Sequence, residues 1–460
     1  MERKLTTHQQ EVFEEIVNTI EGNLFTFDKR KDINDRLLSL TGQAGTGKSV
    51  LTTKITKYII DKLNANNCYS NDSIVVTAPT HKATSVLRNM LLADDIKAEC
   101  KTIYSFLNIE PIYDYNTGEE KFAVARGKHT PAAASLLVID ESSMISEELY
   151  KLILETITTG KVNTILFIGD PFQLLPVDNS DENEVFKIKK QFELTQIVRQ
   201  AENSPIIKLA TKVRNMIETQ KFGDLNKLIK ESKSDDIELF ESREEFLESF
   251  YENDQWYKED KIISSFTNNQ VDNFNKDVRV RFWEERGINN PAHFLASDMI
   301  RFKKALIENG FFKDNNRTIY SNNQEVMLNH AELVDTGKDG LRFWKCTVVG
   351  RKYTDFIRII DPDSELLYNE KLEGLANLAK TTKYPYKMGF WKDYHQLKNA
   401  FANVQYVYAA TIHKLQGSSY NFAYIDLASL LHNKHILDDM KFRLVYVAIT
   451  RAKLGLKILY

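Results

Sequence analysis

The sequence predicts an α/β protein built on mainly parallel sheets, and three observations indicate this class. Short β-branched runs alternate with longer helical patterns over roughly the first 200 residues, which is typical of βαβ units. One apolar run leads into a glycine-rich loop and a helical run, and another ends in two adjacent carboxylates. Hydrophobic residues make up 42% and charged residues 27% of the chain, ordinary values for a soluble protein with buried cores.

The composition excludes several other classes of protein. No apolar run approaches the about 18–20 residues that a membrane span needs, and the N-terminus lacks an apolar signal-peptide core. The three cysteines, Cys68, Cys100 and Cys346, lack metal-ligand spacing, which predicts free thiols in a reducing compartment. Sixty-one basic against 64 acidic residues give a net charge of −3, which excludes a wholly basic surface but permits a local basic groove. We therefore expect a cytoplasmic protein without a membrane partner.

The first region is expected to contain four buried strands, each followed by a turn-rich or polar break. These strands are Arg36–Leu40, Ser73–Thr77, Leu136–Ile139 and Thr164–Ile168. A helical run, Val50–Leu63, follows the first of them. Apolar strands that alternate with helices in this way favour a parallel sheet covered on both faces.

A shorter piece, from about Pro111 to Lys128, interrupts this rhythm. Its two halves, Ile112–Tyr115 and Lys121–Val124, alternate polar and apolar residues across Asn116-Thr117-Gly118. This pattern predicts a β-hairpin.

The βα rhythm resumes from Ser204 to about Asn275 and again after Val404. The expected strands there are Lys261–Phe266, Ala423–Leu427 and Leu456–Leu459. Between them, residues 276–402 are irregular and rich in aromatics, with short strands expected at Glu325–Leu328, Thr347–Tyr353 and Phe356–Ile360. The simplest organisation is two α/β domains, 1–203 and 204–275 joined to 403–460, with insertions at 107–130 and 276–402.

The strongest chemical signal is a phosphate-binding loop. The run Gly42-Gln43-Ala44-Gly45-Thr46-Gly47-Lys48-Ser49 completes a GxxxxGK[ST] pattern between a strand and a helix. Its glycines let the backbone N–H groups wrap phosphate at a helix N-terminus. Lys48 would supply charge to the β- and γ-phosphates, and Ser49 would offer a hydroxyl to Mg²⁺.

A second signal is the pair Asp140-Glu141, which follows the apolar strand Leu136–Ile139. Asp140 would hold Mg²⁺ through water, while Glu141 would orient and deprotonate the attacking water. Adjacent carboxylates are common on solvated surfaces, but this pair follows a buried strand in a chain that carries a phosphate-binding loop. The combination predicts NTP hydrolysis and disfavours a kinase.

An ordered series of further motifs resembles the superfamily 1 DNA helicases over nearly the whole chain, most closely the small phage Dda-type enzymes and their RecD-like relatives. The resemblance implies two RecA-like domains that sandwich ATP. It further implies that the hairpin insertion is a pin and that residues 276–402 form a small β-barrel with a protruding tower.

The resemblance implies nucleotide contacts on the first domain. Gln9, in the run Leu5–Gln10, corresponds to the glutamine that reads the adenine edge, although the same run also reads as a polar helix start capped by Thr6 or Thr7. Gln173, in Gly169–Pro176, is placed by its motif against the γ-phosphate.

The second domain is expected to contribute two arginines and a glutamine–glycine pair. Arg199 and Arg451 match the family's arginines, which neutralise phosphate charge when the cleft closes; the alternative is an exposed structural arginine. Gln416 and Gly417 match the motif that links nucleotide to strand and are expected beside the nucleotide.

Loops after strands in both domains are expected to bind the DNA backbone. Hydroxyl groups, backbone N–H groups and asparagine side chains suit phosphate contacts that do not read sequence. The residues implied by the resemblance are Thr80, His81, Thr102, Ser105, Thr267, Asn268, Thr411 and His413. Tyr104 departs from the histidine that is common among relatives.

The pin is expected to wedge into the fork, with Phe122 as the wedge residue. A stacked aromatic contributes about 1–3 kcal/mol per base. Further contacts are expected from Tyr113, Tyr115, Lys121, Arg126 and Lys128, and a contact of the pin with the tower from Phe390-Trp391-Lys392. An ordinary half-buried hairpin is the alternative.

Together the motifs and the resemblance predict an ATP- and Mg²⁺-dependent DNA helicase that acts as a monomer on single-stranded and forked DNA. The resemblance implies that it moves 5′→3′. Single-stranded-DNA-binding or replication proteins are further candidate partners. Three alternatives remain open: the same motor acting on RNA, a P-loop phosphotransferase, and a nucleotide-gated scaffold.

Overall fold

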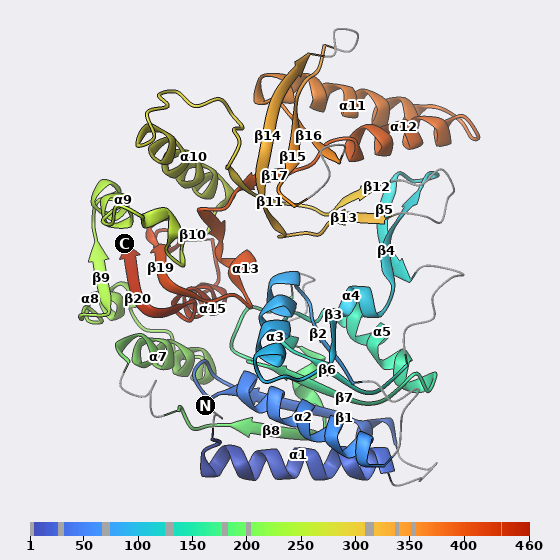
Figure 1. The fold of residues 1–460 in the computed structure, drawn as a ribbon, viewed down its shortest axis with the longest axis vertical. Helices are drawn as coiled ribbons and strands as arrows, with labels where there is room; N and C mark the ends of the chain where they lie inside the picture. Colours follow the sequence, from blue (N-terminus) through green and yellow to red (C-terminus); the bar gives the residue numbers. More distant parts are fainter. Residues whose placement is uncertain are drawn as a thin grey trace. The chain divides into compact units, whose positions relative to one another are not determined.

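A computed structural model gives the structure of the chain over residues 4–25, 32–66, 74–124, 133–176, 183–198, 204–308, 317–335, 340–350, 355–433 and 435–460. The chain forms two compact units (Figure 1). The first comprises residues 1–107, 130–271 and 410–460, and the second comprises residues 108–129 and 272–409.

The first unit contains a six-stranded sheet with the order β3-β2-β6-β7-β1-β8, in which every neighbouring pair is parallel. Its central strands are runs of fully buried residues, because helices cover both faces. The strands are β1 (Leu37–Gly42), β2 (Ile74–Ala78), β3 (Glu99–Thr102), β6 (Ala134–Ile139), β7 (Val162–Gly169) and β8 (Lys190–Leu194).

Five α-helices accompany this sheet within the described residues. Ile16 and Ile20 of α1, Leu51 and Ile55 of α2, and Leu38 of β1 belong to one buried core. The helices are α1 (Thr7–Phe25), α2 (Lys48–Ala65), α3 (His81–Ala93), α4 (Ile103–Phe106) and α5 (Glu147–Thr158); short 3₁₀ turns are η1 (Ile33–Arg36), η2 (Ser142–Met144) and η3 (Glu184–Lys187).

The first unit also contains a five-stranded sheet with the order β18-β10-β19-β20-β9. The three pairs from β10 to β9 are parallel. Its strands are β9 (Ile237–Phe240), β10 (Lys261–Ser265), β18 (Ala409–Thr411), β19 (Tyr420–Asp426) and β20 (Ala452–Leu459). Its helices are α7 (Pro205–Thr219), α8 (Leu225–Lys230), α9 (Arg243–Phe250), α13 (Ile412–Leu415), α14 (Ala428–Leu431) and α15 (Asp438–Ile449), with the turn η4 (Trp256–Lys258).

The second unit is built on an antiparallel sheet with the order β16-β15-β14-β11-β17. The rings of Phe302 and Tyr320 stack at 4.5 Å in its core. Its strands are β11 (Met299–Phe302), β14 (Glu325–Asp335), β15 (Arg342–Val348), β16 (Phe356–Ile360) and β17 (Val404–Tyr406), with the pairs β12 (Leu306–Glu308)–β13 (Arg317–Tyr320) and β4 (Ile109–Asp114)–β5 (Glu119–Val124). Its helices are α10 (Asn268–Glu284), which begins in the first unit, α11 (Glu365–Thr381) and α12 (Lys387–Asn399), with the turn η5 (Pro362–Ser364).

The predicted strands of the first region, the hairpin and the strand Phe356–Ile360 are confirmed to within a few residues. The predicted strand Thr347–Tyr353 overlaps an observed strand only at residues 347–348, and its residues 351–353 lie outside the described residues. The observed strand is Arg342–Val348, which ends before Gly350, whose φ of +80° is incompatible with an extended strand. The small β-barrel expected for residues 276–402 stays a prediction; the described residues of this region contain the five-stranded antiparallel sheet given above.

Two further features bear on the predicted organisation. Helix α10 runs without interruption across the position, between residues 275 and 276, where the insertion was expected to begin. Among the described residues, no helix is both long and apolar enough to cross a bilayer.

Candidate nucleotide site and nucleic-acid track

The phosphate-binding loop joins β1 to α2 and requires its glycines. Gly45 and Gly47 both have a φ of +85°, and a Cβ on Gly42 would lie 2.7 Å from Thr46 Oγ1. No side chain caps the N-terminus of α2, so its first N–H groups face the loop. Lys48 Nζ donates to the carbonyl oxygens of Gly42, at 2.5 Å, and Gln43, at 3.1 Å. This is the geometry of an anion site at a helix N-terminus.

Gln9 forms part of the wall of this loop. Its side chain is 4% exposed, and its Nε2 donates to the carbonyl oxygen of Thr46 at 2.7 Å. Its Oε1 accepts from Thr6 N at 3.0 Å, while Thr6 Oγ1 accepts from Gln9 N at 3.2 Å. The helix-start reading is therefore confirmed for Thr6, and Gln9 additionally contacts the loop. Ala44 and Ser49 are half-buried in the same loop, and Thr46 is buried.

The adjacent carboxylates lie at the end of β6, as predicted from the apolar strand before them. Asp140 Oδ1 accepts from Glu141 N at 2.9 Å, and Glu141 has a left-handed φ of +51°. Burial, together with the neighbouring carboxylate of Glu141, raises the pKa of Asp140 to about 7, against the opposing effects of the Glu141 N–H and the Lys48 ammonium. A non-glycine residue held in this conformation marks stored backbone strain, which is common at functional sites.

Gln173 and Gln416 meet directly. Gln416 Nε2 donates to Gln173 Oε1 at 3.2 Å and to Ser143 Oγ at 3.0 Å, and all three side chains are buried. Gly417 follows with a φ of +73°, and a Cβ placed there would lie 3.3 Å from Glu141 Cγ. Four of the predicted site residues are thus brought together: Glu141 after β6, Gln173 after β7, and Gln416 and Gly417 after α13.

Buried polar contacts join the two parallel sheets. Tyr446 on α15 donates from its hydroxyl to Asp170 Oδ2 at 2.5 Å, at the end of β7. Arg443 donates to the carbonyl oxygens of Pro171 and Gln173 at 2.8 and 2.9 Å. Sequence reasoning missed Tyr446 and Arg443 as site residues, because α15 reads as an ordinary buried helix.

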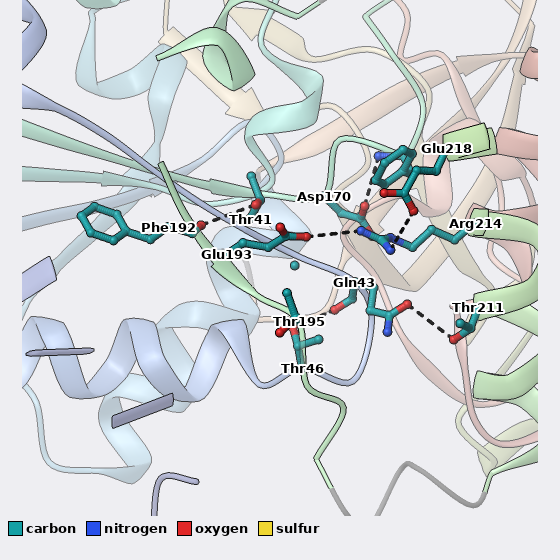
Figure 2. Close-up of polar contacts among 12 residues, drawn as sticks. Thr41, Gln43, Thr46, Asp170, Phe192, Glu193, Thr195, Thr211, Arg214 and Glu218 are labelled. Atoms are coloured by element: carbon teal, nitrogen blue, oxygen red, sulfur yellow. Dashed lines mark hydrogen bonds and ion pairs between the residues drawn. The ribbon is translucent and has the colours of Figure 1, made fainter. Parts of the chain in front are cut away.

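Figure 2 shows the outer rim of the same site, where Glu193 of β8 and Arg214 of α7 point toward each other. Glu193 Oε1 lies 3.6 Å from an Arg214 terminal nitrogen, and Thr211 Oγ1 donates to Gln43 Oε1 at 3.4 Å. The Arg214 guanidinium also lies 4.4 Å from the centroid of the Phe172 ring. These residues carry no motif, so no sequence signal marked them.

Of the two predicted arginines, the structure describes Arg451. It is 6% exposed, and its guanidinium donates to the carbonyl oxygens of Ser418, at 2.6 Å, and Val447, at 2.9 Å. Burial lowers the pKa of Arg451, while the carboxylate of Glu141 has the opposite effect. Arg199 lies outside the described residues.

The predicted DNA contacts of the first sheet lie at one edge, because Ala78 of β2 pairs with Thr102 of β3. Thr80 and Thr102 are helix N-caps, whose hydroxyls accept from Ala83 N and Ser105 N, each at 3.2 Å. Both threonines therefore have a structural role as helix N-caps, whether or not they also contact DNA. The side chains of His81 and Ser105 are exposed beside them.

The predicted contacts of the second sheet follow β10 and β18, which are neighbours. Thr267 Oγ1 accepts from Gln270 N at 3.3 Å, and Asn268 is exposed. Thr411 is buried, whereas the exposed His413 lies with its ring 6.5 Å from that of Phe266.

A further contact joins a helix of the first parallel sheet to a strand of the second. Lys82 of α3 hydrogen-bonds to the hydroxyl of Tyr420 of β19 and lies 4.2 Å from the centroid of its ring. Tyr420 was not predicted as a site residue.

In the second unit, the pin packs on α12, and the predicted contact of Trp391 is confirmed. A Cβ on Gly118, in the turn of the pin, would lie 2.5 Å from the Trp391 ring. Tyr113 accepts from Asn399 Nδ2 at 2.8 Å and lies 4.4 Å, ring to ring, from the buried His395. The ring of Tyr115 lies 6.0 Å from that of His395, so both tyrosines contact α12, and their predicted contacts with DNA stay a prediction. The side chains of Lys121 and Phe122, and all of Arg126 and Lys128, lie outside the described residues.

A phosphate-binding loop, an acidic strand end and a second parallel sheet that reaches into the same site define a P-loop nucleotide hydrolase with two RecA-like domains. The comparisons with known proteins agree. The AAA domain family model matches residues 31–230, and the UvrD-like helicase C-terminal domain model matches residues 406–459.

The ATP-dependent DNA helicase dda of Enterobacteria phage T4 is 30% identical over 453 residues, which cover 90% of this chain and 92% of the phage protein. The ATP-dependent RecD2 DNA helicase of Deinococcus radiodurans is 30% identical over 177 residues, 38% of this chain and 21% of that protein. The crystal structure of Pif1 helicase from Bacteroides in complex with ADP-AlF3 and ssDNA has the same fold, with a TM-score of 0.50 at 17% identity over 99% of this chain and 92% of that chain. The chain belongs to the Dda-type family of superfamily 1 helicases, and the protein is an ATP-dependent DNA helicase.

Proposed function

We propose that this helicase moves along single-stranded DNA in the 5′→3′ direction and separates duplex DNA ahead of it. The direction follows from the resemblance to Dda-type enzymes. The coupling of ATP hydrolysis to movement is argued from one observation, the hydrogen bond between Gln173 and Gln416, at 3.2 Å. Gln173 follows a strand of the first sheet, whereas Gln416 follows the helix that begins after Thr411 and includes His413. A change at the nucleotide is therefore transmitted directly to the segment proposed to grip DNA.

Within this proposal, the chain's own residues have distinct tasks in ATP hydrolysis. Lys48 leaves its two carbonyl acceptors to meet the β- and γ-phosphates, and Glu141 orients and deprotonates the attacking water. Gln173, Arg199 and Arg451 sense and neutralise the terminal phosphate. The hydrogen bonds of Arg451 to main-chain carbonyls keep its buried charge in place before nucleotide arrives.

The donor set at this site fits Mg²⁺. Ser49 offers a hydroxyl and Asp140 a carboxylate, hard oxygen ligands that suit an ion which keeps several waters and takes its remaining ligands from phosphates. Bound there, Mg²⁺ would supply positive charge to the phosphates. The raised pKa of Asp140 fits this role, because a buried carboxylate without a cation is costly to ionise.

Single-stranded DNA is proposed to cross the exposed strand ends of both sheets. The candidate contacts on the first sheet are Thr80, His81, Thr102 and Ser105, and those on the second are Thr267, Asn268, Thr411 and His413.

The pin is proposed to separate the duplex with Phe122 as its wedge residue. The substitution Phe122→Ala should therefore slow unwinding more than translocation, whereas equal slowing of both would refute the wedge role.

One experiment tests direction and substrate together. Unwinding is measured on partial duplexes with a 5′ or a 3′ single-stranded tail, and ATPase stimulation is compared for DNA and RNA oligonucleotides. The proposal expects unwinding only with the 5′ tail and stronger stimulation by DNA. Unwinding that requires the 3′ tail would refute the direction, and stronger stimulation by RNA would refute the assignment to DNA.

A further inference from the structure

The connection between α11 and α12 carries two exposed tyrosines in a basic setting. Tyr384 and Tyr386 are 69% and 76% exposed, among the most exposed large hydrophobic side chains of the described residues. They flank Pro385 in the run Lys383-Tyr384-Pro385-Tyr386-Lys387. Figure 1 shows α11 and α12 side by side as a helical hairpin, with this connection at its end. No core contact accounts for either ring.

The charge of this segment is unlike that of the whole chain. The chain carries a net charge of −3, but between Glu373 and Asp393 there are four lysines and no acidic residue. Lys380, Lys383 and Lys392 are exposed. None of the four lysines forms an ion pair with a residue in the part of the chain that the structure describes. Proteins that bind single-stranded nucleic acid combine lysines or arginines, which contact phosphates, with exposed aromatic rings, on which bases stack. This segment has both.

The local backbone favours this use. Pro385 fixes its own φ, so the turn that presents both rings is stiff, and less conformational freedom is lost when a base stacks on them. Tyr386 also lies close to the pin. It precedes Trp391, which touches the turn of the pin, by five residues of α12, or about 8 Å along a helix axis.

We propose that the α11–α12 connection, residues 380–387, is a second DNA site that binds the unpaired strand displaced at the pin. This inference rests on the proposed function. The pin and the α11–α12 connection belong to the same unit and are linked through Trp391, so we assign the connection to the unpaired strand that the pin would displace. Tyr384 and Tyr386 stack on its bases, and Lys380, Lys383 and Lys387 contact its phosphates.

The test compares two labelled substrates by equilibrium anisotropy without ATP: a duplex with a 5′ tail alone, and the same duplex with an additional unpaired 3′ flap. The double variant Tyr384→Ala/Tyr386→Ala should lose about tenfold in affinity for the flapped fork and little for the flapless duplex. The matched control is Leu366→Ala/Leu378→Ala, which removes exposed apolar side chains from the same helical hairpin, 74% and 49% exposed. The control should bind both substrates as the unaltered protein does.

A second variant tests the lysines. Lys380→Gln, Lys383→Gln and Lys387→Gln combined should lower the dependence of log affinity on log salt for the flapped fork by about 0.7 per lysine. An unchanged salt dependence would overturn the phosphate contacts.

Two outcomes of the tyrosine variant would overturn the site. Unchanged affinity for the flapped fork would indicate that the α11–α12 connection serves a protein partner instead. An equal loss of affinity for both substrates would assign the connection to the duplex or the tracking strand. The stimulation of ATPase by single-stranded DNA is measured on the same samples. Its absence in the unaltered protein would refute the proposed function instead, whatever the binding result.

Discussion

The buried bond between Tyr446 and Asp170 gives the sharpest quantitative prediction, for the substitution Tyr446→Phe. The hydroxyl donates at 2.5 Å to a carboxylate that is 1% exposed, and burial together with Asp170 raises the pKa of Tyr446 well above its usual range. The phenol therefore remains a donor at any working pH. Its removal leaves Asp170 Oδ2 buried without this donor.

A hydrogen bond to a charged group contributes about 1.5–3 kcal/mol, against about 0.5–1.5 kcal/mol for one to a neutral acceptor. The matched control is Tyr424→Phe, because Tyr424 is also buried and donates at 2.8 Å to the neutral carbonyl of Ser249. We expect Tyr446→Phe to lower the free energy of unfolding by about 1.5–3 kcal/mol and the control by about 1 kcal/mol. The measurement is urea unfolding followed by tryptophan fluorescence.

The two substitutions should differ further in activity. The bond of Tyr446 joins α15 to the end of β7, next to Gln173, whereas that of Tyr424 lies within the second parallel sheet and its helices. We expect DNA-stimulated ATPase activity to fall about tenfold in Tyr446→Phe, because a loss of about 1.4 kcal/mol in the contact between α15 and the end of β7 corresponds to a factor of ten in rate. In Tyr424→Phe we expect this activity to be unchanged. Equal destabilisation by the two variants, with ATPase activity intact in both, would refute the reasoning.

Three further predictions concern single residues. Lys48→Ala should abolish DNA-stimulated ATPase activity while circular dichroism stays unchanged; full activity in a pure sample would contradict the phosphate-binding role. Gly417→Ala should reduce ATP turnover, because the new Cβ would lie 3.3 Å from Glu141 Cγ, whereas Gly160→Ala, which has a similar φ of +71° and nothing within 4 Å, should only destabilise the fold by about 1–2 kcal/mol. Burial lowers the pKa of His395 in the folded protein below its ordinary value of 6.5, so on acidification the imidazole is protonated first in the unfolded chain. The stability that the buried neutral ring contributes is therefore fully present above pH 6.5 and is lost as the pH falls below it. Hydrogen exchange of residues 109–124, corrected for intrinsic rates, should therefore quicken at pH 5.5 relative to pH 7.5, and His395→Phe should remove that difference.

Much of the nucleotide site was predictable because its chemistry is local. The loop from Gly42 to Ser49 and the pair Asp140-Glu141 each follow a buried apolar strand, so pattern and spacing were sufficient to place them. Strand β3 was missed, since Glu99–Thr102 is short, polar and at an edge of its sheet.

Helix α11 was missed for a different reason. Only Ala379 of its side chains is buried, so it lacks the apolar stripe by which a helix is recognised in sequence. The contacts of Tyr446 with Asp170 and of Arg214 with Glu193 were beyond sequence reasoning too, because each joins segments that are distant along the chain and whose side chains meet only after both sheets have formed.

The attachment of the pin to α12 has a thermodynamic consequence. A hairpin turn free in solution would lose about 1–2 kcal/mol of backbone entropy for each residue that it orders on meeting DNA. Here Gly118 lies against Trp391, and Tyr113 is bonded to Asn399, so that ordering is complete once the protein has folded. Under the proposed wedge role, the pin would therefore meet DNA with the backbone of its turn already ordered, and little of this entropy would be lost on binding.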